Sequence, residues 1–267
     1  ELPFEVYPDV WELVQSTTEL CLGKKCPFRK ECFYMKTRMK KMEADILISN
    51  HHVFFSDLNV RAETDFDSEY LILPRYDMVI FDEAHNIESV ARSYFSVEVS
   101  KISFTRLLHR IYQKKSKKKK EKSALTRVEE TIDEKYLEKP GDYLELLKTM
   151  KSEIYSLQTI GDEYFDEIRK MFETNTEAPI RKSLNNFEMT KSNFLENLRD
   201  KKEFFQAKLA EFLNLMMAFN NVIDEEKDKN PEVINFNNHL KIFKKYIDSF
   251  KFINNFSDAD YVYWLDI

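Results

Sequence analysis

Glycine is nearly absent from this sequence, which contains only Gly23, Gly141 and Gly161 among 267 residues. Glycine adopts positive φ angles without strain, so tight turns and phosphate-binding loops depend on it. Such a loop needs closely spaced glycines before Lys-Ser or Lys-Thr, whereas Gly23-Lys24 is followed by another lysine. The scarcity of glycine therefore favours long helices over tightly turned sheets, and it excludes a phosphate-binding loop (Walker A motif) from this sequence.

The composition predicts a folded protein of the cytoplasm. The sequence is 43% hydrophobic and 14% aromatic, enough to bury a core in one large or two ordinary domains. Its apolar runs are shorter than the roughly 20 residues that cross a bilayer, and its first residues lack the pattern of a signal peptide. Three cysteines within twelve residues do not make the disulfide framework of a secreted protein.

Positive charge is concentrated near the N-terminus, although the net charge is −6. The window from Cys21 to Met42 holds a single acid and eight basic residues: Lys24, Lys25, Arg29, Lys30, Lys36, Arg38, Lys40 and Lys41. A compact basic patch on an acidic protein is typical of contact with a polyanion, and it is equally typical of a solvated helix face.

Two short apolar runs, 46–48 and 76–81, have the pattern of buried parallel strands. They indicate one layer of an α/β domain, with too few strands to complete a sheet. The run from Tyr261 to Asp266 is also strand-like.

Helical spacing dominates after residue 100. It predicts helices over 101–113, 125–137, 142–158 and 182–226, with a lysine-rich run at 114–122 and breaks at Gly161-Asp162 and Ala178-Pro179. Apolar residues alternate in steps of three and four along two stretches, which predicts a seam between antiparallel helices. The residues of this seam are Phe205, Leu209, Phe212, Met216, Phe219 and Ile223, followed by Phe236, Leu240, Phe243, Ile247 and Phe250.

Two adjacent acids, Asp82 and Glu83, follow the second strand-like run directly. Ligand sites in parallel sheets lie beyond the carboxyl ends of the strands. Mg²⁺ keeps most of its water and needs few carboxylates, so we expect Asp82 to hold Mg²⁺ through water and Glu83 to activate a water as a base. We expect His85 to couple this site to its surroundings. An ordinary strand end with solvated acids is the competing interpretation.

The three cysteines have the spacing Cys21-x4-Cys26-x5-Cys32. Three thiols this close favour a shared metal over unligated cysteines. An iron–sulfur cluster takes four thiolates, and a zinc site also needs a fourth ligand, for which His51 or His52 is available. Both kinds of site, and simple burial, remain open from the spacing.

Three stretches in this order resemble the DinG branch of the XPD-like, iron–sulfur superfamily 2 DNA helicases: CLGKKCPFRKEC, ADILISNHHVFF and YDMVIFDEAHNIESVAR. The resemblance implies a mixed, mainly helical fold in four parts: the end of an iron–sulfur domain (1–42), a segment of a RecA-like motor domain (43–99), a helical arch (100–258) and a return strand (259–267). It also implies that Cys21, Cys26 and Cys32 hold a [4Fe–4S] cluster with a fourth cysteine before Glu1, and that residues 82–85 are the DEAH box (Walker B motif).

The same resemblance implies a function for a longer protein. Members of this family are ATP-dependent 5′→3′ DNA helicases that use ATP and Mg²⁺ and act in DNA repair. We therefore expect this chain to be an internal segment of a monomeric helicase that acts on single-stranded or forked DNA, and to be inactive by itself. The expected DNA-binding residues are Lys24, Lys25, Arg29, Lys30, Lys36 and Arg38. The alternative is a non-enzymatic helical module that binds nucleic acid or protein and has a zinc-type cysteine site.

Overall fold

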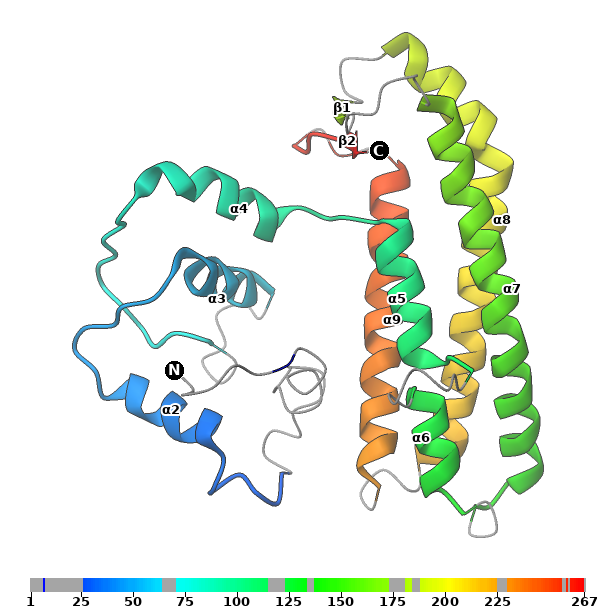
Figure 1. Cartoon of the computed structure of the whole chain (residues 1–267), viewed down its shortest axis with the longest axis horizontal. Helices are drawn as coiled ribbons and strands as arrows, with labels where there is room; N and C mark the ends of the chain where they lie inside the picture. The colour runs from blue at the N-terminus through cyan, green and yellow to red at the C-terminus, as the bar shows by residue number, and fades with distance from the viewer. Residues whose placement is uncertain are drawn as a thin grey trace. The chain divides into compact units, whose positions relative to one another are not determined.

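A computed structural model describes Tyr7 and residues 26–63, 71–114, 123–133, 137–172, 181–183, 188–224, 230–255, 258 and 260–266. Contacts divide the chain into two units, Glu1–Val97 and Glu98–Ile267 (Figure 1). Three residues of the predicted sites, Cys21, Lys24 and Lys25, lie outside the described residues, as does most of the lysine-rich run.

The described part of unit 1 contains short helices. They are α2 (Phe33–Met42), α3 (His51–Glu63), the 3₁₀ turn η2 (Ala84–Asn86) and α4 (Ile87–Phe95). The helix α3 begins where Asn50 Oδ1 accepts a hydrogen bond from the amide of Val53 at 2.8 Å, a standard N-terminal cap. It packs against α4.

Unit 2 is a bundle of long helices. It comprises α5 (Lys101–Ile111), α6 (Ala124–Thr131), α7 (Pro140–Phe172), α8 (Glu188–Ile223) and α9 (Pro231–Asn255). Helix α8 contacts both α7 and α9, α5 contacts α7 and α9, and α6 contacts α9 (Figure 1). The predominantly helical fold expected from the glycine-poor sequence is confirmed. No helix among the described residues is long and apolar enough to cross a membrane.

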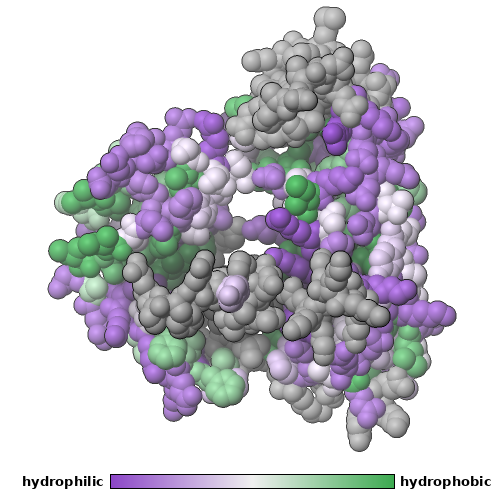
Figure 2. Space-filling view, viewed as in Figure 1, coloured by the Kyte–Doolittle hydropathy of each residue, from purple (hydrophilic) through white to green (hydrophobic). Residues whose placement is uncertain are grey.

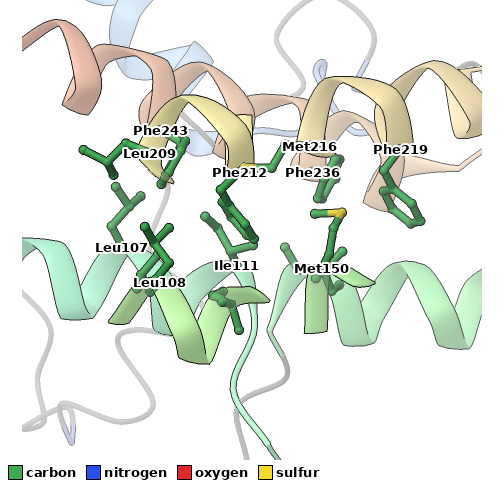
Figure 3. Packing of buried hydrophobic residues seen from close by; sticks show 14 of the residues in the cluster. Leu107, Leu108, Ile111, Met150, Leu209, Phe212, Met216, Phe219, Phe236 and Phe243 are labelled. Atoms are coloured by element: carbon green, nitrogen blue, oxygen red, sulfur yellow. The ribbon is translucent and has the colours of Figure 1, made fainter. Parts of the chain in front are cut away.

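The predicted apolar seam is the core of unit 2 (Figure 3). Three aromatic pairs join α8 to α9 edge to face: Phe205–Phe250, Phe212–Phe243 and Phe219–Phe236, with ring centroids 5.1, 5.4 and 5.2 Å apart. As the α8 position rises, its α9 partner falls, so the two helices are antiparallel as predicted. All six of these phenylalanines are at most 2% exposed. Such edge-to-face pairs add to the stabilisation that burial already gives.

Helix α7 continues through Gly161, where the sequence predicted a break. The reason is the packing of α5 against α7. A Cβ added at Gly161 would lie 2.2 Å from Cε1 of Phe104, so the absent side chain makes room for this buried ring. The glycine therefore serves a close approach between helices instead of ending one. The second predicted break, Ala178-Pro179, lies outside the described residues.

The predicted parallel strands do not form within the described residues. The two strands present there are β1 (Arg181–Ser183) and β2 (Trp264–Asp266), which pair antiparallel with Arg181 opposite Asp266. The runs 46–48 and 76–81 are irregular, and Ile48 and Ile80 are 98% and 88% exposed. A strand needs neighbouring strands to pair its backbone groups, and the described residues supply none for these runs. Strand β2 lies in the predicted return strand, but its described partner belongs to unit 2.

Candidate functional site

Asp82 and Glu83 lie on an exposed turn between the apolar run 76–81 and helix α4. The amide of Glu83 donates to Oδ1 of Asp82 at 3.0 Å, and the amide of Asn86 donates to the carbonyl of Glu83 at 3.0 Å, which closes the turn η2. The turn therefore joins an apolar run to a helix and presents two adjacent carboxylates to solvent.

Glu83 has a backbone conformation that is rare for a residue with a side chain. Its φ and ψ are both 49°, in the left-handed region, and it is the one described non-glycine residue with positive φ. This conformation costs a non-glycine residue on the order of 1–2 kcal/mol, and such strain is often retained at functional positions. Nδ1 of His85 lies 3.1 Å from Oε2 of Glu83. The two side chains are 71% and 68% exposed, respectively. The structure thus brings together Glu83 and His85, which the sequence assigned to one site.

Aromatic contacts hold the apolar run beside α3. The ring of Phe81 lies 5.1 Å from Phe54 in an edge-to-face pair and 5.9 Å from His51. Phe54 also contacts Tyr76, with centroids 6.0 Å apart. The residue next to Asp82 is therefore fixed by the first turn of α3. The neighbouring His52, considered above as a zinc ligand with His51, lies against Tyr94 of α4 at 5.8 Å.

Cys26 and Cys32 are free and half-buried, and a hydrogen-bonded turn separates them. The amide of Cys32 donates to the carbonyl of Phe28 at 3.0 Å, and Cys32 then precedes the first residue of α2. Their thiols are of the type that zinc and iron–sulfur clusters take. In the described part of the chain, no three His, Cys, Asp or Glu side chains converge as metal ligands. With Cys21 undescribed, the cluster stays a prediction.

The predicted DNA-binding residues differ in their surroundings. Lys30 and Lys36 are exposed, and Nζ of Lys36 lies 5.5 Å from the ring centroid of Phe33. Arg29 is half-buried. Arg38 is also half-buried, and its Nη2 donates to the carbonyl of Leu71 at 2.9 Å. The structure thus gives Arg38 a partner inside the protein, which the sequence did not predict.

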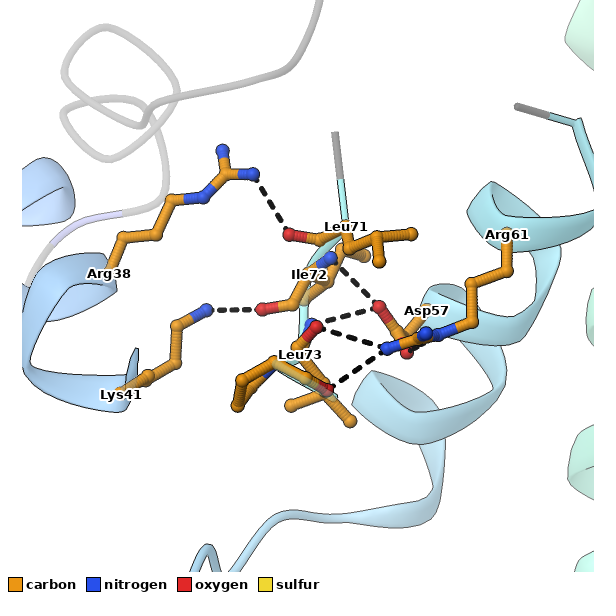
Figure 4. A network of polar contacts seen from close by, with 8 residues as sticks. Arg38, Lys41, Asp57, Arg61, Leu71, Ile72 and Leu73 are labelled. Carbon is orange, nitrogen blue, oxygen red and sulfur yellow. Dashed lines mark hydrogen bonds and ion pairs between the residues drawn. The ribbon is translucent and has the colours of Figure 1, made fainter. Parts of the chain in front are cut away.

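A buried polar cluster in unit 1 was also missed by the sequence (Figure 4). Asp57 on α3 is fully buried, and its Oδ2 accepts from Nε of Arg61 at 2.6 Å. Its Oδ1 accepts from the amides of Ile72 and Leu73, both at 2.8 Å. Nη2 of Arg61 in turn donates to the carbonyls of Leu73 at 3.1 Å and Pro74 at 3.0 Å.

Two basic residues of α2 complete this cluster from the other side. Besides the contact of Arg38 with Leu71, Nζ of Lys41 donates to the carbonyl of Ile72. Partial burial and the charge of Arg38 lower the pKa of Lys41, although Asp57 acts in the opposite direction. We call the set Arg38, Lys41, Asp57, Arg61 and the backbone of 71–74 the latch. The only sequence signal for it was the spacing of four between Asp57 and Arg61, which is also common on exposed helix faces.

Comparison with known proteins shows what the first part of the chain is similar to. Residues 6–104 match the family model DEAD_2. The ATP-dependent DNA helicase YoaA of Escherichia coli (strain K12) is 43% identical over 90 residues, which are 34% of this chain and 14% of that protein. The matched region is similar to helicases of the DinG/XPD-like family.

Further relatives show the same similarity to DinG-like helicases. YoaA of Haemophilus influenzae is 41% identical over 80 residues, 30% of this chain and 12% of that protein. The ATP-dependent helicase DinG of Mycobacterium tuberculosis (strain ATCC 25618 / H37Rv) is 28% identical over 102 residues, 38% of this chain and 14% of that protein. The chain thus aligns with 12–14% of the length of these curated relatives. No solved structure gives a significant match.

Proposed function

We propose that this chain is part of an ATP-dependent DNA helicase and supplies the acidic turn of its ATP site. The observation that carries the proposal is the turn itself. Adjacent carboxylates follow an apolar run and precede a helix, with a strained backbone at Glu83, inside the region that matches helicases. The phosphate-binding loop and the second motor domain come from sequence outside this chain.

The roles of the two acids follow from their contacts. Asp82 uses Oδ1 for the amide of Glu83, and we assign its other oxygen to a water bound to Mg²⁺, which neutralises phosphate charge when present. Glu83 takes the proton of the water that attacks the terminal phosphate of ATP. His85, 3.1 Å from Glu83, orients that carboxylate when its Nδ1 carries a proton.

The exposed apolar runs support a larger sheet. We propose that 46–48 and 76–81 become strands of a RecA-like motor domain when the remaining strands are present, because burial of residues such as Ile48 and Ile80 requires such neighbours. The helices of 100–258 then form the arch of the helicase, and 259–267 lead back to the motor domain. The 5′→3′ direction and the monomeric state rest on the resemblance alone.

Cys21, Cys26 and Cys32 would hold a [4Fe–4S] cluster together with a cysteine from outside this chain. The two described thiols support this proposal by their type and by their half-buried turn. The cluster would fix the basic segment around Lys30, which contacts the phosphates of single-stranded or forked DNA. Anaerobically purified full-length protein is expected to be brown with about four irons per chain. A colourless protein that contains zinc would contradict the cluster.

The catalytic proposal is tested by Glu83→Gln in the full-length protein. Loss of a general base typically lowers a rate on the order of 10²–10⁴-fold, so we expect DNA-stimulated ATP hydrolysis to fall by that factor. Glu88→Gln is the matched control, because Glu88 lies five residues on, is exposed and pairs with Arg92 on α4. Equal rates for the two variants would refute the role of Glu83.

A further inference from the structure

The basic residues of α2 fall on two faces of the helix. At 100° per residue, Lys36 and Lys40 lie on one side, and Arg38 and Lys41 lie on nearly the opposite side. Lys36 and Lys40 are exposed, whereas Arg38 and Lys41 are half-buried against the carbonyls of Leu71 and Ile72. One face of α2 is therefore open to a ligand, and the other is bound to the segment 71–74.

The segment 71–74 is in turn fixed to α3. The buried Asp57 accepts hydrogen bonds from the amides of Ile72 and Leu73, and Arg61 donates to the carbonyls of Leu73 and Pro74. The peptide groups 71–72 and 72–73 are thus each held from both sides: α2 donates to the carbonyl and Asp57 of α3 accepts from the amide (Figure 4). A buried carboxylate with three donors is rigid, because displacement would leave charged and polar groups unpaired.

The same segment leads directly to the acidic turn. The chain runs from Pro74 into the apolar run 76–81 and then into Asp82. Arg61 also lies over the ring of Tyr76 at 5.1 Å, and Phe81 packs on His51 and Phe54 at the start of α3. The helix α3 therefore contacts both ends of the stretch between the latch and the acids.

We propose that Arg38 and Lys41 are positioning residues that link DNA bound on the open face of α2 to the acidic turn at Asp82 and Glu83. They bind no phosphate themselves. They transmit the position of α2 through the segment 71–74 and the Asp57–Arg61 pair, so that DNA binding raises the rate of ATP hydrolysis. This inference rests on the function proposed above, and it reassigns Arg38 from DNA contact to internal coupling.

The test compares two double variants of the full-length protein that remove the same charge from the same helix. Arg38→Ala/Lys41→Ala removes the latch face, and Lys36→Ala/Lys40→Ala removes the open face. ATP hydrolysis is measured as a function of the concentration of single-stranded oligothymidylate. Two readouts are taken: the maximal stimulation, which is the rate at saturating DNA divided by the rate without DNA, and the DNA concentration that gives half of it.

For the latch variant we expect the maximal stimulation to fall about tenfold, within the range usual for coupling between two sites, with little change in the half-maximal DNA concentration. For the open-face variant we expect the half-maximal concentration to rise severalfold and its salt dependence to decrease, with the maximum retained. Arg38→Lys/Lys41→Arg, which keeps a donor at each position, is expected to restore most of the stimulation.

Three outcomes would overturn the inference. In the first, the latch variant shifts only the half-maximal DNA concentration, which would make Arg38 and Lys41 ordinary DNA contacts. In the second, its rates with and without DNA fall by the same factor, which would make the latch merely structural. In the third, the wild-type protein shows no DNA-stimulated hydrolysis, which would also remove the proposed function. The first two leave the result of Glu83→Gln unaffected and so separate the two proposals.

Discussion

The two units differ in how they are held together. Unit 2 buries many large side chains, including Phe104, Phe205 and Phe219, in one continuous core. Unit 1 leaves most of its described large apolar side chains in solvent, among them Phe33, Ile48 and Ile80. Its buried polar contacts are those of the latch. Figure 2 shows apolar patches among hydrophilic residues on unit 1 and a mainly hydrophilic surface over α7.

This contrast follows from the backbone. A helix satisfies its own hydrogen bonds, so a helical sequence needs only an apolar partner face to be stable. A strand depends on other strands for the same bonds. Unit 2 has its partner faces within the described chain, whereas the described residues give the apolar runs 46–48 and 76–81 of unit 1 no neighbouring strand. The residues that we assign to an ATP site, Asp82 and Glu83, lie in unit 1.

Disruption of the core of unit 2 should have the largest effect on stability. Phe205 is fully buried against Phe104 and Phe250, while the adjacent Phe204 is 53% exposed. We expect Phe205→Ala to lower the free energy of unfolding by about 3–5 kcal/mol, because it leaves a cavity, and Phe204→Ala to change it by less than about 1 kcal/mol. Chemical denaturation followed by far-UV circular dichroism measures both. Similar values for the two variants would mean that the seam is not the core.

The corresponding change in unit 1 removes a charge. Asp57→Ala leaves Arg61 and the amides of Ile72 and Leu73 without their acceptor, and we expect a local destabilisation of about 3 kcal/mol. Hydrogen exchange at Leu73 should therefore be faster by on the order of 10²-fold, since 1.4 kcal/mol is a factor of ten. The exposed Asp45 provides a control, and Asp45→Ala is expected to leave this exchange rate unchanged. Unchanged protection in Asp57→Ala would show that the latch does not order unit 1.

Substitution of two glycines of α7 should change the free energy of unfolding by smaller amounts, in opposite directions. An added methyl group would overlap Phe104 at Gly161 but has nothing within 4 Å at Gly141. We expect Gly161→Ala to lower the free energy of unfolding by about 1–3 kcal/mol and Gly141→Ala to raise it by about 0.5 kcal/mol. Thermal denaturation of the two variants measures this difference. A stabilising Gly161→Ala would contradict the close approach of α5 and α7.

Much of unit 2 could be predicted from its sequence, because helical packing depends on local spacing. The steps of three and four from Phe205 to Ile223 identified both the seam and its antiparallel partner. The break predicted at Gly161 was wrong, because the contact that explains this glycine comes from Phe104, 57 positions earlier in the sequence. Contacts between distant positions leave no periodic signal.

The sequence could name candidate residues for the site, but it could not predict the contacts of the latch nearby. The sequence assigned Asp82 and Glu83 from their place after an apolar run. The structure shows that this run is irregular and places both acids on an exposed turn before α4, so their role stays a prediction. The latch could not be predicted, because its acceptors are backbone carbonyls and amides, which every sequence has. Arg38 and Lys36 look alike in sequence, and only the structure separates the bound cation from the exposed one.

Hydrogen exchange tests the proposed sheet most directly, by comparing this 267-residue chain with the longer protein proposed above. In the 267-residue chain, we expect the amides of α8 to be protected and those of 46–48 and 79–81 to exchange almost as fast as in an unfolded peptide. In the full-length protein, we expect the two apolar runs to gain strong protection as strands. Runs that stay unprotected in the full-length protein would contradict the placement of Asp82 and Glu83 at the end of a sheet strand.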